Sequence, residues 1–268
     1  MGRSTAGFSS AGFYMALITV SYINGGKEMI NDKFTDVEQR VMENWHNGSE
    51  IKDDVNYDDP SSINIKFFRG LMKETAYHEA GHLVARMFTG LEFSHVQLVS
   101  IIPDKVTNGQ MRCERPFTEL YLEQVPMAQM QRSQGYSLLL ELFAGYGSVM
   151  VIEQSECETL WEYFYEELYI DEEYYEDGSD LCRADRIAGI LSRPHFSKDR
   201  ILGMTAGWTL EMLKMPAVWN AVETIAEILI SKGEITNENI EIFSDLRRTL
   251  NVPMVMKMPK WSRRIYGK

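Results

Sequence analysis

The chain has 268 residues and is 44% hydrophobic, so it has the length and the apolar content to bury a sizeable core. Its net charge of −12 comes almost entirely from residues 153–177, which contain eleven Asp and Glu and no Lys or Arg. Because no long basic region is present, nucleic-acid binding is not expected. Cys113, Cys157 and Cys182 are isolated and odd in number, which excludes a disulfide framework and favours a cytoplasmic location.

Three parts are expected along the chain: an N-terminal extension, a main domain and a basic C-terminal tail, over residues 1–65, 66–250 and 251–268. In the extension, the apolar run from Ala11 to Ile23 is shorter than the roughly 20 residues that span a bilayer. A transmembrane helix is therefore not expected there, although peripheral membrane association stays open. Apolar residues at helical spacing predict a helix over residues 27–47. The acidic, Pro-containing stretch 53–62 is typical of a linker and marks the domain boundary.

The main domain is predicted to be mainly α-helical with a minor β component. β-Branched residues predict a strand over residues 95–103, which Pro103 ends. A further strand is expected over 63–68, and a short edge strand over 110–113 follows the turn at Asn108–Gly109. Apolar periodicity and flanking Gly, Pro and cap residues predict helices over residues 70–88, 136–152, 181–191, 197–213, 217–232 and 236–250. We therefore expect a helical domain with a small β-hairpin or sheet beside the helix 70–88.

The helix 70–88 contains the pattern H-E-x-x-H as His78-Glu79-Ala80-Gly81-His82. Residues four apart lie on one face of a helix, so the two imidazoles can bind one metal ion. Glu79 lies about 100° further round the helix and can reach a water molecule held by that ion. The surrounding apolar residues predict a buried helix, which has little reason to carry such polar groups unless they are paired or bind a ligand. The pattern predicts zinc ligands at His78 and His82 and a general base at Glu79.

A catalytic zinc needs a third protein ligand and one open position. No third histidine follows at the spacing of the longer H-E-x-x-H-x-x-G-x-x-H pattern, because position 88 is Phe. His95 and His195 stand alone and are expected to be structural. A carboxylate at a helix start is the better candidate, and Asp180 is the clearest one. Spacing alone does not distinguish this role from a helix cap, and the rival carboxylates are Glu153, Asp177 and Asp185.

Five blocks of the sequence carry a family resemblance. They are Thr75-Ala-Tyr-His-Glu-Ala-Gly-His82, Val99-Ser-Ile-Ile-Pro103, Leu142-Phe-Ala-Gly-Tyr-Gly-Ser148, Gly178-Ser-Asp-Leu-Cys-Arg-Ala184 and the segment from Trp219 to Ile240. In this order they resemble the peptidase domain of FtsH-type ATP-dependent zinc metalloproteases over about residues 66–248; the first block is specific and the others are individually weak. The resemblance implies that Asp180 is the third zinc ligand. It also implies a substrate-binding strand edge at Asn108, Gly109, Gln110 and Met111.

The chain departs from that family in one large respect. The family carries an ATPase module before its peptidase, whereas residues 1–65 are too short for one, and the Gly-Gly-Lys at residues 25–27 lacks the rest of a Walker loop. The acidic segment 153–177 also looks longer than the family's connection, so the assignment of Asp180 rests on the Gly-Ser-Asp block. We expect substrates that are already unfolded or short, unless a separate ATPase or a homo-oligomer prepares them.

The sequence as a whole predicts a zinc metalloendopeptidase. In this hypothesis His78, His82 and Asp180 hold Zn²⁺, Glu79 takes the proton of the activated water, and a polypeptide substrate lies along the edge strand near residues 108–113. Two other functions stay open. One is a non-catalytic binding or scaffold module of the same fold, acting through the acidic and aromatic residues of 153–177. The other is a metallopeptidase with a single regulatory substrate.

Overall fold

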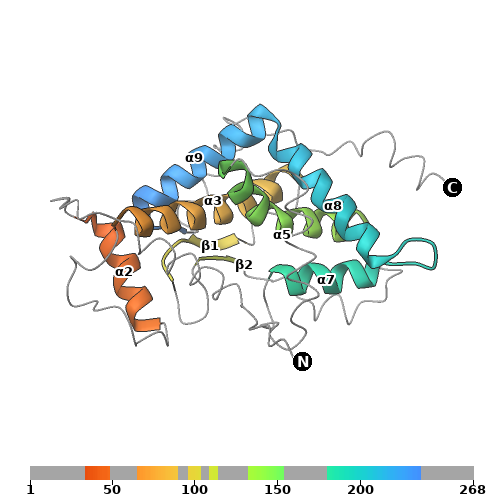
Figure 1. The fold of residues 1–268 in the computed structure, drawn as a ribbon, viewed down its shortest axis with the longest axis horizontal. Coiled ribbons are helices and arrows are strands. Elements are labelled where there is room, and N and C mark those ends of the chain that lie inside the picture. Colours follow the sequence, from red (N-terminus) through yellow and green to blue (C-terminus); the bar gives the residue numbers. More distant parts are fainter. Residues whose placement is uncertain are drawn as a thin grey trace, which may run out of the picture.

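The computed structural model describes residues 34–48, 65–89, 96–103, 109–113, 132–153 and 180–236. The elements follow in the order α2 (Asp36–Gly48), α3 (Ile65–Thr89), β1 (Val96–Ser100), β2 (Gln110–Cys113), α5 (Arg132–Ile152), α7 (Asp180–Leu191), α8 (Lys198–Leu213), α9 (Pro216–Lys232) and β3 (Glu234–Thr236) (Figure 1). Helices dominate the described part of the chain and the strands are short. The prediction of a mainly α domain with a minor β component is confirmed.

The long helix α3 lies in the middle of the molecule and carries the H-E-x-x-H motif (Figure 1). It begins earlier than expected, so the strand predicted over residues 63–68 is wrong for the described residues 65–68, which form the start of α3. A short apolar run fits a strand and a buried helix equally well. Here Phe68 is buried, with its ring edge-on to that of Phe34 at a centroid distance of 6.1 Å. Phe68, the last residue of that run, therefore lies on the face of α3 that packs on the segment leading into α2.

The three strands form one antiparallel sheet in the order β2-β1-β3. β1 and β2 are the strands predicted within residues 95–103 and 110–113, whereas β3 falls just before and at the start of the helix expected over 236–250. β3 exists because Gly233, at φ 81°, reverses the chain after α9, so that Ile235 pairs with Val99. Residues 237–250 lie outside the described part.

The helices predicted over residues 136–152, 181–191, 197–213 and 217–232 are confirmed as α5, α7, α8 and α9. Their ends follow from local chemistry. The Ser197 hydroxyl accepts a hydrogen bond from the Arg200 backbone N–H at the start of α8, and Pro216 opens α9, where its missing N–H costs nothing.

The core has two apolar clusters that meet at the contact between α3 and α5. One is built mainly from α2, α3, β1, α9 and β3, and the other from α5, α7 and α8. The two central helices run antiparallel, since Arg86 of α3 meets Glu141 of α5 whereas Gly81, further back along α3, meets Ala144. A Cβ at Gly81 would overlap the Ala144 carbonyl oxygen, so only glycine allows the helices to approach this closely.

The helix α2 belongs to the part of the chain that the sequence assigns to an N-terminal extension. A reciprocal capping box opens it: the Thr35 N–H donates to Glu38 Oε2 at 2.7 Å, and the Glu38 N–H donates to the Thr35 hydroxyl at 3.2 Å. Val37 and Val41 of α2 lie in the same core cluster as α3. This extension therefore shares the core of the main domain in its described part.

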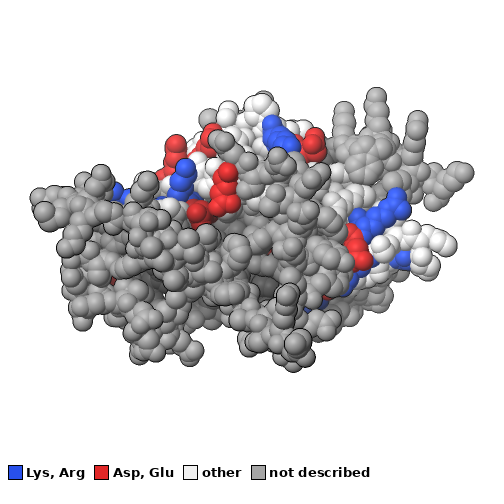
Figure 2. Space-filling view, in the orientation of Figure 1, with Lys and Arg blue, Asp and Glu red and all other residues white. Residues whose placement is uncertain are grey.

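One described helix, α5, is long and apolar enough over Gln134–Ile152 to cross a membrane, but 72% of that window is buried inside the protein. A buried central helix of a soluble protein has this composition. On the face shown in Figure 2, the described acidic and basic side chains are interspersed and do not gather into a patch of one sign.

Candidate metal centre

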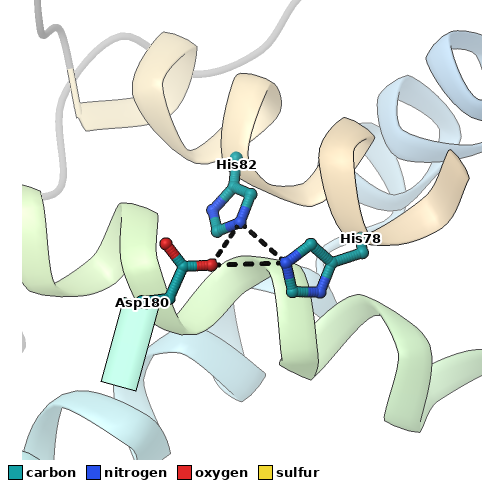
Figure 3. Close-up of side chains that lie close together, drawn as sticks. All are labelled: His78, His82 and Asp180. Carbon is teal, nitrogen blue, oxygen red and sulfur yellow. Dashed lines mark hydrogen bonds and ion pairs between the residues drawn. The ribbon is translucent and has the colours of Figure 1, made fainter. Parts of the chain in front are cut away.

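Three side chains from two distant segments of the chain converge where α3, α5 and α7 meet. His78 and His82 point from successive turns of α3 toward Asp180, the first residue of α7 (Figure 3). Asp180 Oδ2 lies 2.8 Å from His82 Nε2 and 3.3 Å from His78 Nε2, and the two Nε2 atoms are 3.0 Å apart. The three candidate ligands of the sequence hypothesis thus lie within contact of one another.

This donor set could hold a metal ion, and its imidazole nitrogens and carboxylate oxygen are donors that zinc accepts. Tetrahedral zinc with bonds of about 2.0–2.1 Å holds its ligand atoms about 3.3 Å apart, which is close to the observed separations. His82 Nδ1 lies 2.8 Å from the Glu141 backbone carbonyl, to which it donates when Nδ1 carries the proton. That hydrogen bond leaves Nε2 to face the other two donors, an arrangement usual for metal-binding histidines.

Gly145 of α5 provides the space next to the donor atoms. A Cβ at this position would lie 2.6 Å from His82 Nε2 and 2.8 Å from His78 Nε2. Any larger residue would therefore fill the room beside both imidazoles. The neighbouring Tyr146 packs its ring edge-on against His78 at a centroid distance of 4.8 Å. The α5 backbone thus forms one wall of the site and an aromatic ring forms the next.

Asp180 reaches the histidines because it opens α7. Its position in the first helical turn suits a carboxylate, since the free N–H groups and the helix dipole favour negative charge there. Arg183 lies one turn later, with its Nη1 atom 3.6 Å from Asp180 Oδ1, the oxygen that does not face the imidazoles. The two carboxylate oxygens therefore have different neighbours, and Oδ2 is the one presented to the site.

The charged groups of the site shift one another's pKa values. Burial lowers the pKa of His82, but the Asp180 carboxylate outweighs it and raises that pKa to about 9. Burial lowers the pKa of His78, helped by the charge on His82 and opposed by Asp180. Burial raises the pKa of Asp180, but the two imidazoles outweigh it and hold that pKa well below its usual range. Without metal, the Asp180 carboxylate is therefore ionised at neutral pH and paired with a protonated His82, and a bound cation would take the place of that proton.

Glu79 is buried beside the convergent donors, with 4% of its surface exposed. Its Oε2 atom has no hydrogen-bond partner among the described residues, and burial raises the pKa of the carboxyl to about 8. A buried carboxylate without a partner is costly in a purely structural role. A group whose pKa lies near neutrality is instead well suited to accept and return a proton.

The predicted substrate edge lies partly in the described residues. Gln110 and Met111 belong to β2, an edge strand of the described sheet, and Gly109 precedes it. Gly109 comes close to the motif helix, because a Cβ there would lie 2.7 Å from Glu79 Oε1 and 2.6 Å from Thr75 Cγ2. Asn108 lies outside the described residues. The start of β2 is therefore adjacent to the proposed general base.

The structure separates Asp180 from its described rivals. Asp185 pairs with Lys198 at 2.8 Å, and Glu153 is exposed at the end of α5. His195 is exposed in the turn between Arg193 and Phe196. The remaining two, His95 and Asp177, lie outside the described residues. Within the described part of the chain, His78, His82 and Asp180 are the group that could hold a metal ion.

Sequence reasoning quoted Gly145 and Arg183 within blocks of family resemblance but gave neither of them a role at the site. It missed the buried ion pair of Arg86 with Glu141, in which Arg86 Nη1 donates to both carboxylate oxygens at 2.8 Å. One signal was available. Glu141 is the only charged residue between Arg132 and Glu153, so it interrupts the most apolar helix of the chain. A lone carboxylate in such a run predicts a buried partner.

No protein-family model matches the chain, and no curated protein matches it. The geometry of the site therefore carries the functional argument.

Proposed function

We propose that the protein is a zinc metallopeptidase in which His78, His82 and Asp180 hold the metal and Glu79 is the general base. The observation that carries the proposal is the convergence of two imidazole nitrogens and one carboxylate oxygen, separated by 2.8–3.3 Å, beside a buried carboxylate that has no described partner. Two imidazoles and one carboxylate make three ligands, the number that catalytic zinc sites use while keeping a position open.

Zinc, when bound, supplies Lewis acidity, which lowers the pKa of water and polarises a carbonyl oxygen. The residues of the chain transfer the proton and orient the ligands. Glu79 accepts a proton from the attacking water through its carboxylate and passes that proton to the leaving amine. The Glu141 carbonyl holds the His82 ring in the orientation that presents Nε2. Buried residues of α3 and α5 line one side of the site, while the His78 and Asp180 side chains remain 21% and 17% exposed.

The proposed substrate is an extended polypeptide that pairs with the edge of β2 near Asn108, Gly109, Gln110 and Met111. An edge strand offers backbone N–H and C=O groups to such a chain, which gives affinity with little dependence on sequence. Gly109 lies against Glu79, so a peptide held there would cross the general base. We propose unfolded chains or short peptides as substrates in a cytoplasmic setting, with a separate ATPase or a homo-oligomer as the means of reaching folded ones.

The test compares the natural chain with Glu79→Gln. We expect about one zinc per chain in both proteins, because Glu79 is not a ligand, and a loss of casein and peptide cleavage of about 10²–10⁴-fold in the variant. Metal analysis and cleavage are measured on the same samples. Glu153→Gln makes the same change at an exposed position and is expected to keep full activity.

Two results would redirect the proposal. Full cleavage by Glu79→Gln would remove the general-base role, and far less than one zinc per chain in the natural protein would favour the non-catalytic binding module. Zinc without cleavage of casein would point to a structural site or to one dedicated substrate. Partner capture with Glu79→Gln distinguishes a structural site from a peptidase with one dedicated substrate, because only the peptidase would retain a bound substrate uncut.

A further inference from the structure

Arg86 and Glu141 form a buried ion pair one helical turn beyond His82. Arg86 Nη1 donates to both Glu141 carboxylate oxygens at 2.8 Å, and the two side chains are 4% and 6% exposed. Removing both charges from water costs several kcal/mol per ion, so such a pair is weak evidence of a stabilising role. An apolar pair of similar volume would often be equally stable. The presence of this pair in an apolar helix contact therefore calls for another explanation.

The same residue, Glu141, contacts α3 a second time through its backbone. Its carbonyl oxygen lies 2.8 Å from His82 Nδ1, while its carboxylate is held by Arg86. Because His82 and Arg86 are four residues apart, they lie on one face of α3 and reach the same residue of α5. Glu141 is thus fixed at two points, and the direction of its carbonyl relative to the imidazole depends on both.

We propose that the Arg86–Glu141 pair is a positioning device for His82: it fixes the Glu141 carbonyl that holds the imidazole with Nε2 facing His78 and Asp180. This inference rests on the proposed function, since it concerns affinity for the same metal. Outer groups that orient a ligating histidine are typically worth 10–100-fold in metal affinity. In the contacts described for the two side chains, Arg86 and Glu141 meet each other and not the donor atoms, so each acts through His82.

The matched control is an Arg–Glu pair of the same kind that joins α3 to α2. Arg69 Nε donates to Glu38 Oε1 at 2.6 Å near the opposite end of α3, where the Arg69 side chain is 40% exposed. The same chemical replacement is made at both places: Arg86→Met with Glu141→Leu, and Arg69→Met with Glu38→Leu. A general effect of losing an ion pair on α3 would appear in both double variants, whereas positioning of His82 is altered only in the first.

Two readouts decide the proposal in the full chain. Zinc affinity is measured by competition with a chromophoric chelator, and thermal melting confirms that each variant is folded. In chain labelled with ¹⁵N-histidine and kept free of zinc, proton exchange at His82 Nδ1 reports its hydrogen bond to Glu141. We expect zinc binding about 10–100-fold weaker and rapid exchange of the Nδ1 proton in Arg86→Met/Glu141→Leu, with neither change in the control.

Unchanged zinc affinity together with unchanged proton exchange would overturn the inference and reduce the pair to packing. If the first double variant fails to fold, Glu141→Gln replaces it, because Gln keeps the shape and one acceptor for Arg86. That variant is expected to weaken zinc binding by a smaller factor, and natural affinity in it would again overturn the inference. If the natural chain binds no zinc, the proposed function fails, while His82 proton exchange still tests the positioning role.

Discussion

The two ends of α3 are held by different chemistry. Toward its N-terminal end, Phe68 packs edge-on against Phe34, and the ion pair of Arg69 with Glu38 lies at the rim of that apolar contact. Toward its C-terminal end, α3 presents His82 and Arg86 to α5, and their polar partners are buried. Both ends bury apolar side chains, but at the second end both partners of the ion pair and an imidazole are nearly out of contact with water.

This difference suggests that residues at one end of α3 contribute mainly to stability, whereas those at the other end contribute mainly to metal binding. Burying polar groups is unfavourable unless each of them is paired, so the contacts among His82, Arg86 and Glu141 depend on one another, beside the buried apolar residues of the same half of α3. The N-terminal half stabilises through buried apolar area, which tolerates small changes of geometry better. Substitutions at the two ends should therefore have different consequences. Those at the C-terminal end should weaken metal binding, and those at the N-terminal end should lower the free energy of unfolding.

The largest loss of metal binding is expected from Gly145→Ala, which changes the wall of the site that faces His78 and His82. The added methyl group would lie 2.6 Å from His82 Nε2, where no carbon atom fits without displacing the imidazole. We expect zinc binding to weaken by roughly 100-fold or more, above the usual effect of groups that only orient a ligand, and peptide cleavage to be lost with it. Zinc affinity is measured by chelator competition.

The control for this substitution is Gly189→Ala in α7. It also replaces a helical glycine, but nothing lies within 4 Å of the new Cβ. It should keep natural zinc affinity and gain up to about 1 kcal/mol of stability, because alanine favours the helix. If Gly145→Ala binds zinc as tightly as the natural chain does, the site has more space beside the imidazoles than these distances indicate.

At the N-terminal end of α3, Phe68→Ala is expected to lower the free energy of unfolding. Phe68 is 2% exposed, and truncating a buried Phe typically costs about 3–5 kcal/mol. We expect the free energy of unfolding, measured in urea, to fall by that amount, while the folded protein keeps natural zinc affinity. Met215→Ala, at an exposed apolar residue, should change stability by less than about 0.5 kcal/mol. A fall in zinc affinity as large as that expected for Gly145→Ala would contradict the separation of the two ends.

The same contrast explains which features could be predicted from the sequence. Apolar composition predicted α5, and apolar residues with caps and punctuating glycines predicted α7, α8 and α9. The spacing of His78 and His82 placed both imidazoles on one side of α3. Asp180 was harder, since it is 98 residues beyond His82 in the numbering and came from a local Gly-Ser-Asp pattern. Its approach to the histidines is what the structure adds.

Features that depend on how helices and strands pack against one another were not predictable. The register between α3 and α5 decides that Gly145 faces the imidazoles and that Arg86 meets Glu141, and local periodicity does not specify register. β3 was missed because a three-residue strand is defined by its partner β1 more than by its own composition. The strand predicted over 63–68 was wrong for residues 65–68, because a short apolar run does not distinguish a strand from a buried helix.

The smallest effect is expected from Glu38→Gln at the rim of the stabilising end. Burial raises the pKa of Glu38, but the hydrogen bond from Arg69 and the backbone N–H of Thr35 outweigh it, so the net pKa lies below its usual value of 4.5. A carboxyl with a lowered folded pKa stabilises the protein above its unfolded pKa, and that contribution is lost as the pH falls through the folded value.

The natural chain should therefore exceed Glu38→Gln in unfolding free energy near neutral pH, and the two should converge as the solution is acidified below pH 4.5. Because Arg69 is 40% exposed, the difference at neutral pH should be below about 1 kcal/mol and should shrink in salt. Urea unfolding at a series of pH values measures it, with Glu43→Gln at an exposed position of α2 as the control. If the difference in unfolding free energy stayed constant across the pH series, the effect would belong to the capping box with Thr35, which a neutral side chain also alters. The ion pair of Arg69 with Glu38 would then make no measurable contribution to stability.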